Sequence, residues 1–218
     1  MSRPVQILLD LLFPPKCVFC GKLLRPGERE VCVGCAQGLP WLEGERAKRA
    51  DDFCTLVVSP LRYDGVVRDS IRRYKFGGRR GYAGAYGKLV AGAVRTNLAG
   101  KYDVISWVPL SDKRRRERGY DQAFLLATAT ALELGDVAVE TLRKVRHVDA
   151  QSGLVEDAAR RANVKNAYQV VDPELVEGRR VLLIDDVVTT GSTLSECART
   201  LLAAGALNVV GATLARAR

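Results

Sequence analysis

This sequence of 218 residues lacks three common signatures: a Walker-type nucleotide site, a membrane-spanning segment and a signal peptide. The GxxxxGK[ST] pattern of a Walker-type site is missing, which excludes ATP hydrolysis through that motif. The apolar run at residues 7–13 is interrupted by Asp10, ends at two prolines and lacks a small-residue cleavage site. It predicts one short amphipathic helix, with no membrane insertion and no signal peptide, and we expect a cytoplasmic protein. The single histidine, His147, lies in a polar stretch and is assigned no role.

The composition is that of an ordinary globular chain, with 47% hydrophobic and 27% charged residues. The length suffices for one α/β core and a smaller module. The 34 lysines and arginines outnumber the 25 aspartates and glutamates, and the formal net charge is +9. This excess predicts an anionic partner, and the charge alone leaves nucleic acid and phosphorylated substrates as alternatives.

Four of the six cysteines form two Cys-x-x-Cys pairs, Cys17 with Cys20 and Cys32 with Cys35. Each pair can present two thiolates to one ion, so together they predict a tetrahedral, structural zinc site. Disulfides or a redox motif are the alternative, disfavoured by the reducing compartment that we expect and by the lack of a strand-to-helix context. Cys54 and Cys197 lie apart from these pairs and are expected to be small buried side chains.

A polar and charged segment at residues 43–52 separates the cysteines from the rest of the chain. We interpret it as a linker and place the domain boundary near residue 50. Residues 1–50 would form a zinc-ribbon module with the N-terminal helix and the linker. Residues 51–218 would form the α/β domain.

The most informative stretch joins a strand to a helix through two acids and a hydroxyl-rich turn. The apolar strand predicted at residues 181–184 ends in Asp185 and Asp186, where an open α/β sheet binds its ligands. Gly191 allows the positive φ with which backbone amides converge on an anion. The residues that follow the acids are Val187, Val188, Thr189, Thr190, Gly191, Ser192 and Thr193.

A helix is predicted to follow from residue 194, with Thr193 and Glu196 as a capping box. Its N-terminus would point at the turn and favour a phosphate there, through its partial positive charge and unpaired N–H groups. The two acids suit ribose hydroxyls or a metal ion, so a sugar phosphate satisfies both halves of the pattern. The alternative is a strand whose acids only cap a neighbouring helix.

A basic run at residues 113–118 follows a strand predicted at 102–109. Cations at the carboxyl end of a sheet strand predict a clamp for a pyrophosphate group, and we assign this role to Arg114, Arg115 and Arg118. A basic surface loop is the alternative.

A second basic segment interleaves cations with aromatic rings, and its central residues are Arg72, Arg73, Tyr74, Lys75 and Phe76. Cations that neutralise phosphates, beside rings that stack on bases, predict a surface for single-stranded nucleic acid. The alternative is a solvated helical face whose aromatic side chains point into the core.

The remaining elements are predicted from their apolar patterns. Strands are expected at 55–63 and 206–215, and an Ala- and Leu-rich helix at 122–134 after a turn at Gly119. Residues 142–168 have few apolar anchors and predict a flexible flap, which would exclude water from a reactive intermediate.

The order of short sequence blocks along nearly the whole chain resembles that of the ComF family. The blocks are LLDLLFPPKCVFC at 8–20, CVGC at 32–35, LPW at 39–41, YKFGG at 74–78, VPL at 108–110, RGYDQA at 118–123, QSGL at 151–154, NVKNAY at 163–168 and IDDVVTTGST at 184–193. Two positions depart from the family pattern, since relatives often carry Asn at position 121 and Thr at position 148.

This resemblance implies a zinc ribbon joined to a type I phosphoribosyltransferase-like domain, in which helices flank a parallel sheet. It implies a site for phosphoribosyl pyrophosphate (PRPP) with Mg²⁺. Asp185 and Asp186 would hold the ribose hydroxyls, as candidate catalytic residues, and residues 187–193 would hold the 5′-phosphate. Transfer of the phosphoribosyl group would follow, to an acceptor that no sequence feature identifies.

The resemblance also implies a role in natural competence, on incoming single-stranded DNA, although some relatives are connected with sugar-acid utilisation. A DNA-uptake helicase or a recombination protein would be the protein partner. The alternative is a non-catalytic zinc-ribbon protein that binds single-stranded DNA or acts as an adaptor, with PRPP as a regulatory ligand.

Overall fold

The structure is a computed structural model that describes residues 14–145 and 166–217. Two expectations lie outside this part of the chain. One is the short N-terminal helix at residues 7–13, and the other is most of the flap, which includes His147.

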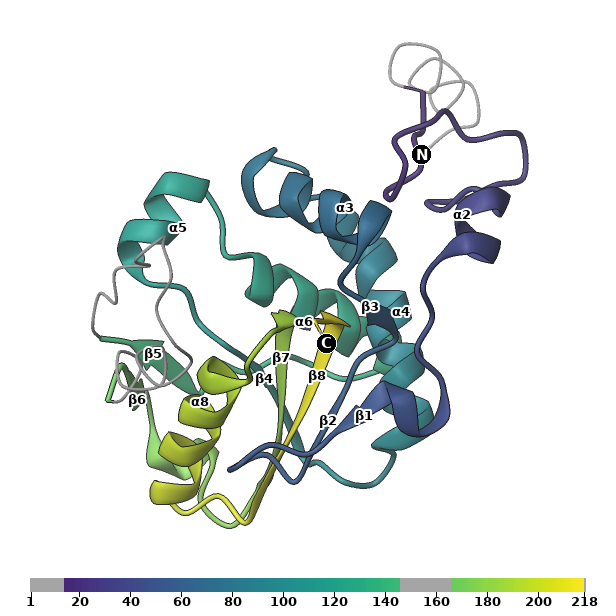
Figure 1. Ribbon diagram of the computed structural model, residues 1–218. Coiled ribbons are helices and arrows are strands. Elements are labelled where there is room, and N and C mark those ends of the chain that lie inside the picture. Colours follow the sequence, from purple (N-terminus) through teal and green to yellow (C-terminus); the bar gives the residue numbers. More distant parts are fainter. Residues whose placement is uncertain (1–13, 146–165, 218) are drawn as a thin grey trace.

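A six-stranded, mainly parallel sheet forms the centre of the described structure (Figure 1). Its order is β1-β2-β8-β7-β4, with β3 also paired to β8. Strands β2, β4, β7 and β8 run parallel, and β1 is antiparallel at one edge. The strands are β1 Lys48–Arg49, β2 Leu56–Val58, β3 Leu61–Arg62, β4 Val104–Trp107, β7 Arg180–Val188 and β8 Asn208–Arg216. The expected α/β fold with a parallel sheet is confirmed.

Helices cover both faces of this sheet (Figure 1). One face carries α3, α4 and α6, and the other carries α8. The longer helices are α3 Gly65–Phe76, α4 Tyr82–Asn97, α6 Gln122–Leu134 and α8 Ser192–Ala203. A small antiparallel pair, β5 Leu142–Lys144 and β6 Tyr168–Val170, lies apart from the main sheet, and a short turn η2 Pro173–Leu175 follows it.

Alternation along β7 sends its side chains into two separate cores. Leu182 and Ile184 lie in the core beneath α3, α4 and α6, whereas Val181 and Leu183 lie in the core beneath α8. All four side chains are fully buried, as the continuous apolar run predicts for a strand covered on both faces.

The predicted elements agree with the structure apart from a few boundaries. The helix predicted at 122–134 is α6, and Gly119 ends the preceding helix with a φ of 73°. The strand predicted at 55–63 is divided into β2 and β3 by Ser59 and Pro60, because proline cannot donate to the ladder. Both pieces pair with β8 in one register, with Val58 opposite Ala212 and Leu61 opposite Ala215.

Two segments are more ordered than the sequence predicted. The basic run expected as a loop or clamp forms a short helix, α5 Asp112–Arg118, which Ser111 caps. The expected linker at 43–52 contains a 3₁₀ turn, η1 Gly44–Ala47, and the edge strand β1. This part of the linker therefore belongs to the sheet, because β1 pairs with β2.

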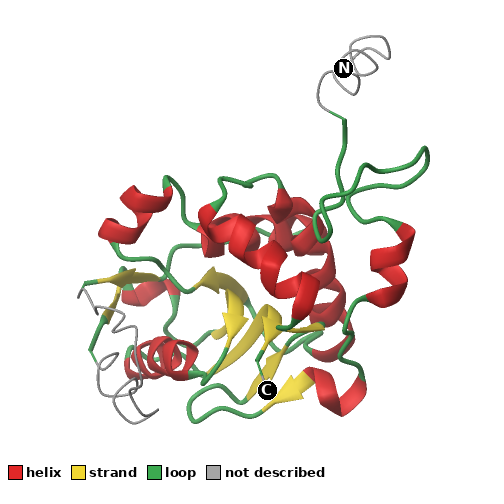
Figure 2. Cartoon of the chain, turned by 45° about the horizontal axis from the view of Figure 1, so that its top comes forward, coloured by secondary structure: helices red, strands yellow, loops and turns green. Residues whose placement is uncertain are grey.

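The cysteine module, residues 17–38, packs against the helical layer of α3 and α4 (Figure 2). It contains the helix α2 Val33–Gly38. Phe19 is fully buried, and its ring centroid lies 5.8 Å from that of Tyr86 on α4. The Arg73 guanidinium on α3 donates to the Phe19 carbonyl at 2.5 Å, and the Ser70 hydroxyl bonds the Val18 carbonyl. The module and the α/β domain thus share one core.

Candidate functional site

The two adjacent acids lie inside β7, not after its end. The strand continues to Val188, and Asp185 pairs in register with Thr213 of β8. The predicted strand end at residue 184 is therefore wrong by four residues. Because neighbouring strand residues point to opposite faces, Asp186 extends toward α3 and Asp185 toward the α8 side.

Lys75 on α3 is the direct partner of Asp186. Its Nζ lies 2.6 Å from Asp186 Oδ1, and the Asp186 side chain is 3% exposed. Burial alone would lower the pKa of the Lys75 ammonium, but the charges of Asp186 and Asp185 outweigh burial and raise it. Lys75, which the sequence assigned to nucleic acid, therefore stays charged beside the acids.

Asp185 has no cation within ion-pair distance in the described part of the chain. It accepts a hydrogen bond of 2.8 Å from the backbone amide of Asp186. Burial and the adjacent Asp186 carboxylate raise the pKa of Asp185 to about 8, although Lys75 opposes the shift. A cation or hydrogen-bond donors of a ligand, bound beside the two acids, would stabilise their negative charge.

Both acids line a cavity of about 250 Å³, which we call the acid cavity. Its other charged residues are Lys75, Arg114, Arg118 and Lys144. Four cations against two acids favour an anionic ligand. The acid cavity also contains Thr189 and Thr193, so it joins the acids to the turn that follows β7.

Three buried polar atoms of the acid cavity have no hydrogen-bond partner among the residues that the structure describes. They are Asp186 Oδ2, Arg118 Nη1 and Gln122 Oε1. Since buried polar atoms are normally paired, these three are available to a ligand. One is a charged donor and two are acceptors, which suits a ligand with both phosphate and hydroxyl groups.

The structure divides the three arginines assigned to the pyrophosphate clamp. Arg114 and Arg118 are four residues apart on α5 and line the acid cavity together, as side chains at this spacing share one helix face. Arg115 points elsewhere: it is exposed and forms a 3.0 Å ion pair with Asp112. Because these residues form a helix and not the expected loop, Arg115 lies on a different face from Arg114 and Arg118.

The hydroxyl turn, residues 189–193, follows β7 and includes the first two residues of α8. Gly191 has a φ of 88°, in agreement with the predicted need for glycine. The Thr190 and Ser192 hydroxyls lie 2.8 Å apart, and a small cavity of about 30 Å³ lies within the turn. The turn therefore gathers hydroxyl and amide donors at the N-terminus of α8.

The predicted capping box is wrong. Gly191 occupies the N-cap position of α8, and no side chain caps it. The Glu196 carboxylate instead accepts from the Asn166 amide at 2.6 Å and from Arg199. Since the helix begins at Ser192, one residue before Thr193, the Thr-x-x-Glu spacing no longer fits the cap.

The residues assigned to nucleic acid have different environments. Arg72 is exposed, Arg73 is bonded to the cysteine module, and Lys75 is paired with Asp186. Tyr74 is fully buried, as the alternative interpretation predicted, whereas Phe76 at the end of α3 is 71% exposed. The Arg118 guanidinium lies over the Phe76 ring, 4.8 Å from its centroid.

Three residues of the acid cavity were missed by the sequence analysis: Gln122, Lys144 and Tyr168. Lys144 and Tyr168 face each other across β5 and β6, with 3.2 Å between Lys144 Nζ and the Tyr168 hydroxyl. Their separation in sequence hides this pairing. Gln122 was visible only as part of the block RGYDQA.

The four cysteines of the two Cys-x-x-Cys pairs are brought together as predicted. Their sulfur atoms all lie within 4.8 Å of one another, and 3.7 Å separates Cys20 Sγ from Cys32 Sγ. Tetrahedral zinc with Zn–S bonds near 2.3 Å requires about 3.8 Å between sulfurs. The Cys32 amide lies 3.4 Å from Cys17 Sγ, and the Cys35 amide the same distance from Cys32 Sγ. The group therefore fits a structural zinc ion held by protein ligands alone.

Cys54 and Cys197 are fully buried, as expected, and lie together in the core beneath α8. Within the described residues, none of the helices has the length and apolar character needed to cross a bilayer.

Two family models match the chain. The phosphoribosyl transferase domain matches residues 121–218, and the double zinc ribbon domain matches residues 8–65. Among solved structures, a glutamine PRPP amidotransferase from B. subtilis is 24% identical with a TM-score of 0.44, and covers 64% of this chain. A PRPP synthetase from Mycobacterium smegmatis is 21% identical with a TM-score of 0.39, and covers 60% of this chain. The chain spans about a third of either structure, 30% and 33%.

Curated relatives extend over most of the sequence. DNA utilization protein YhgH of Escherichia coli O157:H7 is 37% identical over 202 residues, which are 88% of this chain and 86% of the relative. Competence protein ComFC of Bacillus subtilis is 29% identical over 71% of this chain and 61% of the relative. Competence protein F of Haemophilus influenzae is 38% identical over 59% of this chain and 56% of the relative. With a zinc ribbon, a phosphoribosyltransferase-type domain and relatives of this similarity, the chain belongs to the ComF family.

Proposed function

We propose that this protein binds PRPP together with Mg²⁺ and acts as a phosphoribosyltransferase-type protein in DNA uptake. One observation carries the proposal: the acid cavity joins a pair of acids, the hydroxyl turn and four cations in a single space. PRPP has a ribose, a 5′-phosphate and a pyrophosphate group, and each group has a chemical counterpart in this cavity.

Each part of the ligand is assigned by its chemistry. Asp185 and Asp186 accept hydrogen bonds from the ribose hydroxyls. Residues 187–193 bind the 5′-phosphate through amides and hydroxyls at the N-terminus of α8. Arg114 and Arg118 bind the pyrophosphate, because guanidinium groups pair with phosphate oxygens in a fixed fork. Arg115 lies outside the cavity and would act on this group only through its charge.

The oxygen atoms of the acid cavity fit a magnesium ion. Mg²⁺ prefers carboxylate and phosphate oxygens, and Asp186 Oδ2 is buried without a partner within the described residues. Asp185 and Asp186 would hold the ion next to the ribose. When bound, Mg²⁺ supplies positive charge that neutralises the pyrophosphate.

The same residues can assist departure of the pyrophosphate group. Breaking the bond at C1 of the ribose leaves positive charge on the sugar and negative charge on the leaving group. Arg114 and Arg118 stabilise the leaving charge, and the ion pair with Lys75 holds the Asp186 carboxylate in place beside the cavity. These groups are in place before the ligand arrives, which lowers the cost of reorganisation.

Relatives named for competence and DNA utilisation support a role in DNA uptake. In that role the protein acts in the cytoplasm on incoming single-stranded DNA, beside a DNA-uptake helicase or a recombination protein. The structural zinc ion supports the module that packs against α3 and α4.

Calorimetric titration of the zinc-loaded protein with PRPP and MgCl₂ tests the proposal. The wild type should bind saturably and only with Mg²⁺, whereas an Asp185→Asn, Asp186→Asn variant should bind at least about ten-fold more weakly. Asp69→Asn, which removes an exposed acid, is the matched control and should bind as the wild type does. A folded wild-type protein that does not bind PRPP would contradict the proposal.

Binding of single-stranded DNA is supported by a separate observation. Phe76 is 71% exposed beside the acid cavity, and Arg118 covers one face of its ring. Lys75, Phe76, Arg114, Glu117 and Arg118 also line an adjoining cavity of about 360 Å³. A base could stack on the ring while nearby cations, Arg72 included, contact the phosphates.

Fluorescence anisotropy with a labelled oligothymidylate tests this second function. Phe76→Ala should weaken binding by about ten-fold, as expected for the loss of one stacking contact. Phe124→Ala removes another exposed ring, which packs on Trp107, and should have little effect. Equal affinities of the two variants would show that Phe76 does not stack on bases.

A further inference from the structure

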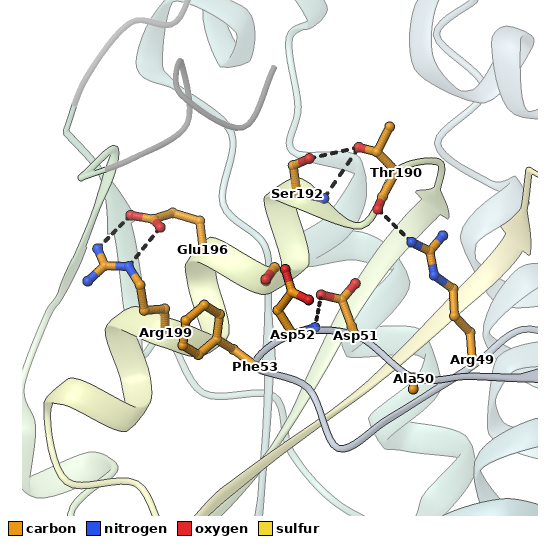
Figure 3. A pocket seen from close by; sticks show the side chains of 10 residues that line it. Arg49, Ala50, Asp51, Asp52, Phe53, Thr190, Ser192, Glu196 and Arg199 are labelled. Carbon is orange, nitrogen blue, oxygen red and sulfur yellow. Dashed lines mark hydrogen bonds and ion pairs between the residues drawn. The ribbon is translucent and has the colours of Figure 1, made fainter. Parts of the chain in front are cut away.

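Arg49 reaches the hydroxyl turn from the segment that follows the cysteine module. It lines a second cavity, of about 430 Å³, together with residues 50–53 and the first turns of α8. Figure 3 shows the Arg49 guanidinium directed at Thr190, with Asp51 and Asp52 beside the start of α8. This cavity lies beside the hydroxyl turn, and of its lining residues only Thr190 and Ser192 belong to that turn.

The Arg49 guanidinium bonds two successive carbonyl groups of the turn. Its Nη1 donates to the Thr189 carbonyl at 2.7 Å, and its Nη2 donates to the Thr190 carbonyl at 2.6 Å. The guanidinium bonds the two carbonyls through two separate nitrogens of a rigid planar fork, whereas a lysine ammonium is a single point donor on a flexible stem, so lysine is not equivalent to arginine at this position.

These two bonds determine where the next two amides point. In a planar trans peptide the carbonyl and the following N–H point in opposite directions. Holding the carbonyls of Thr189 and Thr190 therefore turns the amides of Thr190 and Gly191 away from Arg49. Across the described residues, neither amide donates a hydrogen bond, so both are available to an anion.

Arg49 is itself held in position. It belongs to β1, which pairs with β2, and Arg216 at the end of β8 donates to the Lys48 carbonyl at 2.9 Å. Asp51, two residues later, lies against Gly191. The segment thus supports the turn on the side away from the anion.

We propose that Arg49 is a positioning residue that orients the amides of the hydroxyl turn toward the 5′-phosphate of a ribose phosphate. The proposal rests on the proposed PRPP function and names the group that completes its phosphate site. Arg49 lies within the residues matched by the zinc ribbon model and outside those matched by the phosphoribosyl transferase model. The phosphate site is therefore completed by the N-terminal part of the chain.

The test separates the two ends of the ligand. Ribose 5-phosphate engages the hydroxyl turn without a pyrophosphate, and magnesium pyrophosphate engages Arg114 and Arg118 without a 5′-phosphate. Affinities for both, and for PRPP, are measured by calorimetry on the full-length, zinc-loaded protein. The variants are Arg49→Gln and Arg49→Lys, and Arg46→Gln removes an exposed charge three residues earlier as the control.

Arg49→Gln should weaken the binding of ribose 5-phosphate and PRPP by about ten-fold, the scale of a lost charge-assisted hydrogen bond. The affinity for magnesium pyrophosphate should change less than about two-fold. Arg49→Lys, which keeps the charge and the fold, should recover only part of this loss. Arg46→Gln should leave all three affinities unchanged.

Two results would overturn the role of Arg49 alone: unchanged binding of ribose 5-phosphate by both Arg49 variants, or equal weakening of ribose 5-phosphate and magnesium pyrophosphate. Absence of PRPP binding by the folded wild type is distinct from both. It would overturn the proposed function and this proposal with it.

Discussion

Gly191 combines two requirements at one residue. Its φ of 88° lies in the left-handed region, and a Cβ there would overlap the Asp51 carboxylate. A side chain at residue 191 would therefore introduce left-handed backbone strain and displace the Asp51 carboxylate. Arg49 and Asp51 contact the turn on the side opposite the proposed phosphate site.

Gly191→Ala should lower the free energy of unfolding by about 2 kcal/mol, from left-handed strain of about 1–2 kcal/mol and displacement of Asp51. Gly178→Ala is the control, because Gly178 has a φ of 67° but no neighbouring atom within 4 Å. Urea denaturation measures both variants. Adding Asp51→Ala should bring Gly191→Ala close to the control, and equal costs for the two single variants would exclude the clash.

The raised pKa of Asp185 makes stability depend on pH. Between the ordinary aspartate value of 3.8 and about 8, the unfolded chain loses this proton while the folded chain keeps it. The unfolded state then binds fewer protons, so the free energy of unfolding falls as pH rises through this window. Without ligand, the contribution of Asp185 should fall by more than about 1 kcal/mol.

Urea denaturation of wild type and Asp185→Asn between pH 4.5 and 8 measures this contribution as the difference between the two curves. The wild type should lose stability relative to the variant as pH rises. Asp69→Asn, at an exposed position, should follow the wild type. A constant difference between the wild type and Asp185→Asn would contradict the raised pKa.

At the scale of elements, the close packing of α4 on α6 depends on one glycine. A Cβ at Gly87 would lie 2.7 Å from the Ala129 Cβ and 2.9 Å from the Thr130 amide nitrogen. The helix α6 would have to move. Because α6 also packs on β4 and β7, this contact influences the sheet beneath the acid cavity.

Gly87→Ala should therefore destabilise the protein by about 1–3 kcal/mol, the usual cost of overpacking. Gly92→Ala lies on the same helix, is exposed and meets no atom within 4 Å. It should stabilise the protein by up to about 1 kcal/mol, because alanine favours the helix. Thermal denaturation compares the two, and a similar shift for both would contradict the packing argument.

At the scale of the whole molecule, the cysteine module and the α/β domain share a core. Phe19 packs on Tyr86, and Arg73 donates to the Phe19 carbonyl. Loss of zinc should therefore lower the thermal stability of the entire protein and not only of the module. A short stretch of chain also connects the module to Arg49, which contacts the hydroxyl turn.

Scanning calorimetry of chelator-treated protein should show a single transition at a lower temperature than for the zinc-loaded protein. Adding zinc should restore the original transition, and Cys32→Ser should resemble the chelated state. Two separate transitions, with the larger one unchanged by chelation, would show that the module and the domain unfold independently.

The sequence by itself determined the features that depend on neighbouring residues. The spacing of the four cysteines, the acids followed by the hydroxyl turn, and the helix at 122–134 are all local patterns. Apolar periodicity also predicted most strands, because the burial of a strand on both faces leaves a continuous apolar run.

Tertiary structure alone decided which distant groups meet. The pairing of Lys75 with Asp186, of Arg49 with the hydroxyl turn and of Lys144 with Tyr168 joins segments far apart in sequence. The helical periodicity of α5 directs Arg115 away from the cavity that Arg114 and Arg118 line. Because α8 begins at Ser192, Thr193 and Glu196 do not form the predicted capping box. Local patterns specify elements and residue types, whereas side-chain partners depend on how the elements pack, which no single stretch of sequence contains.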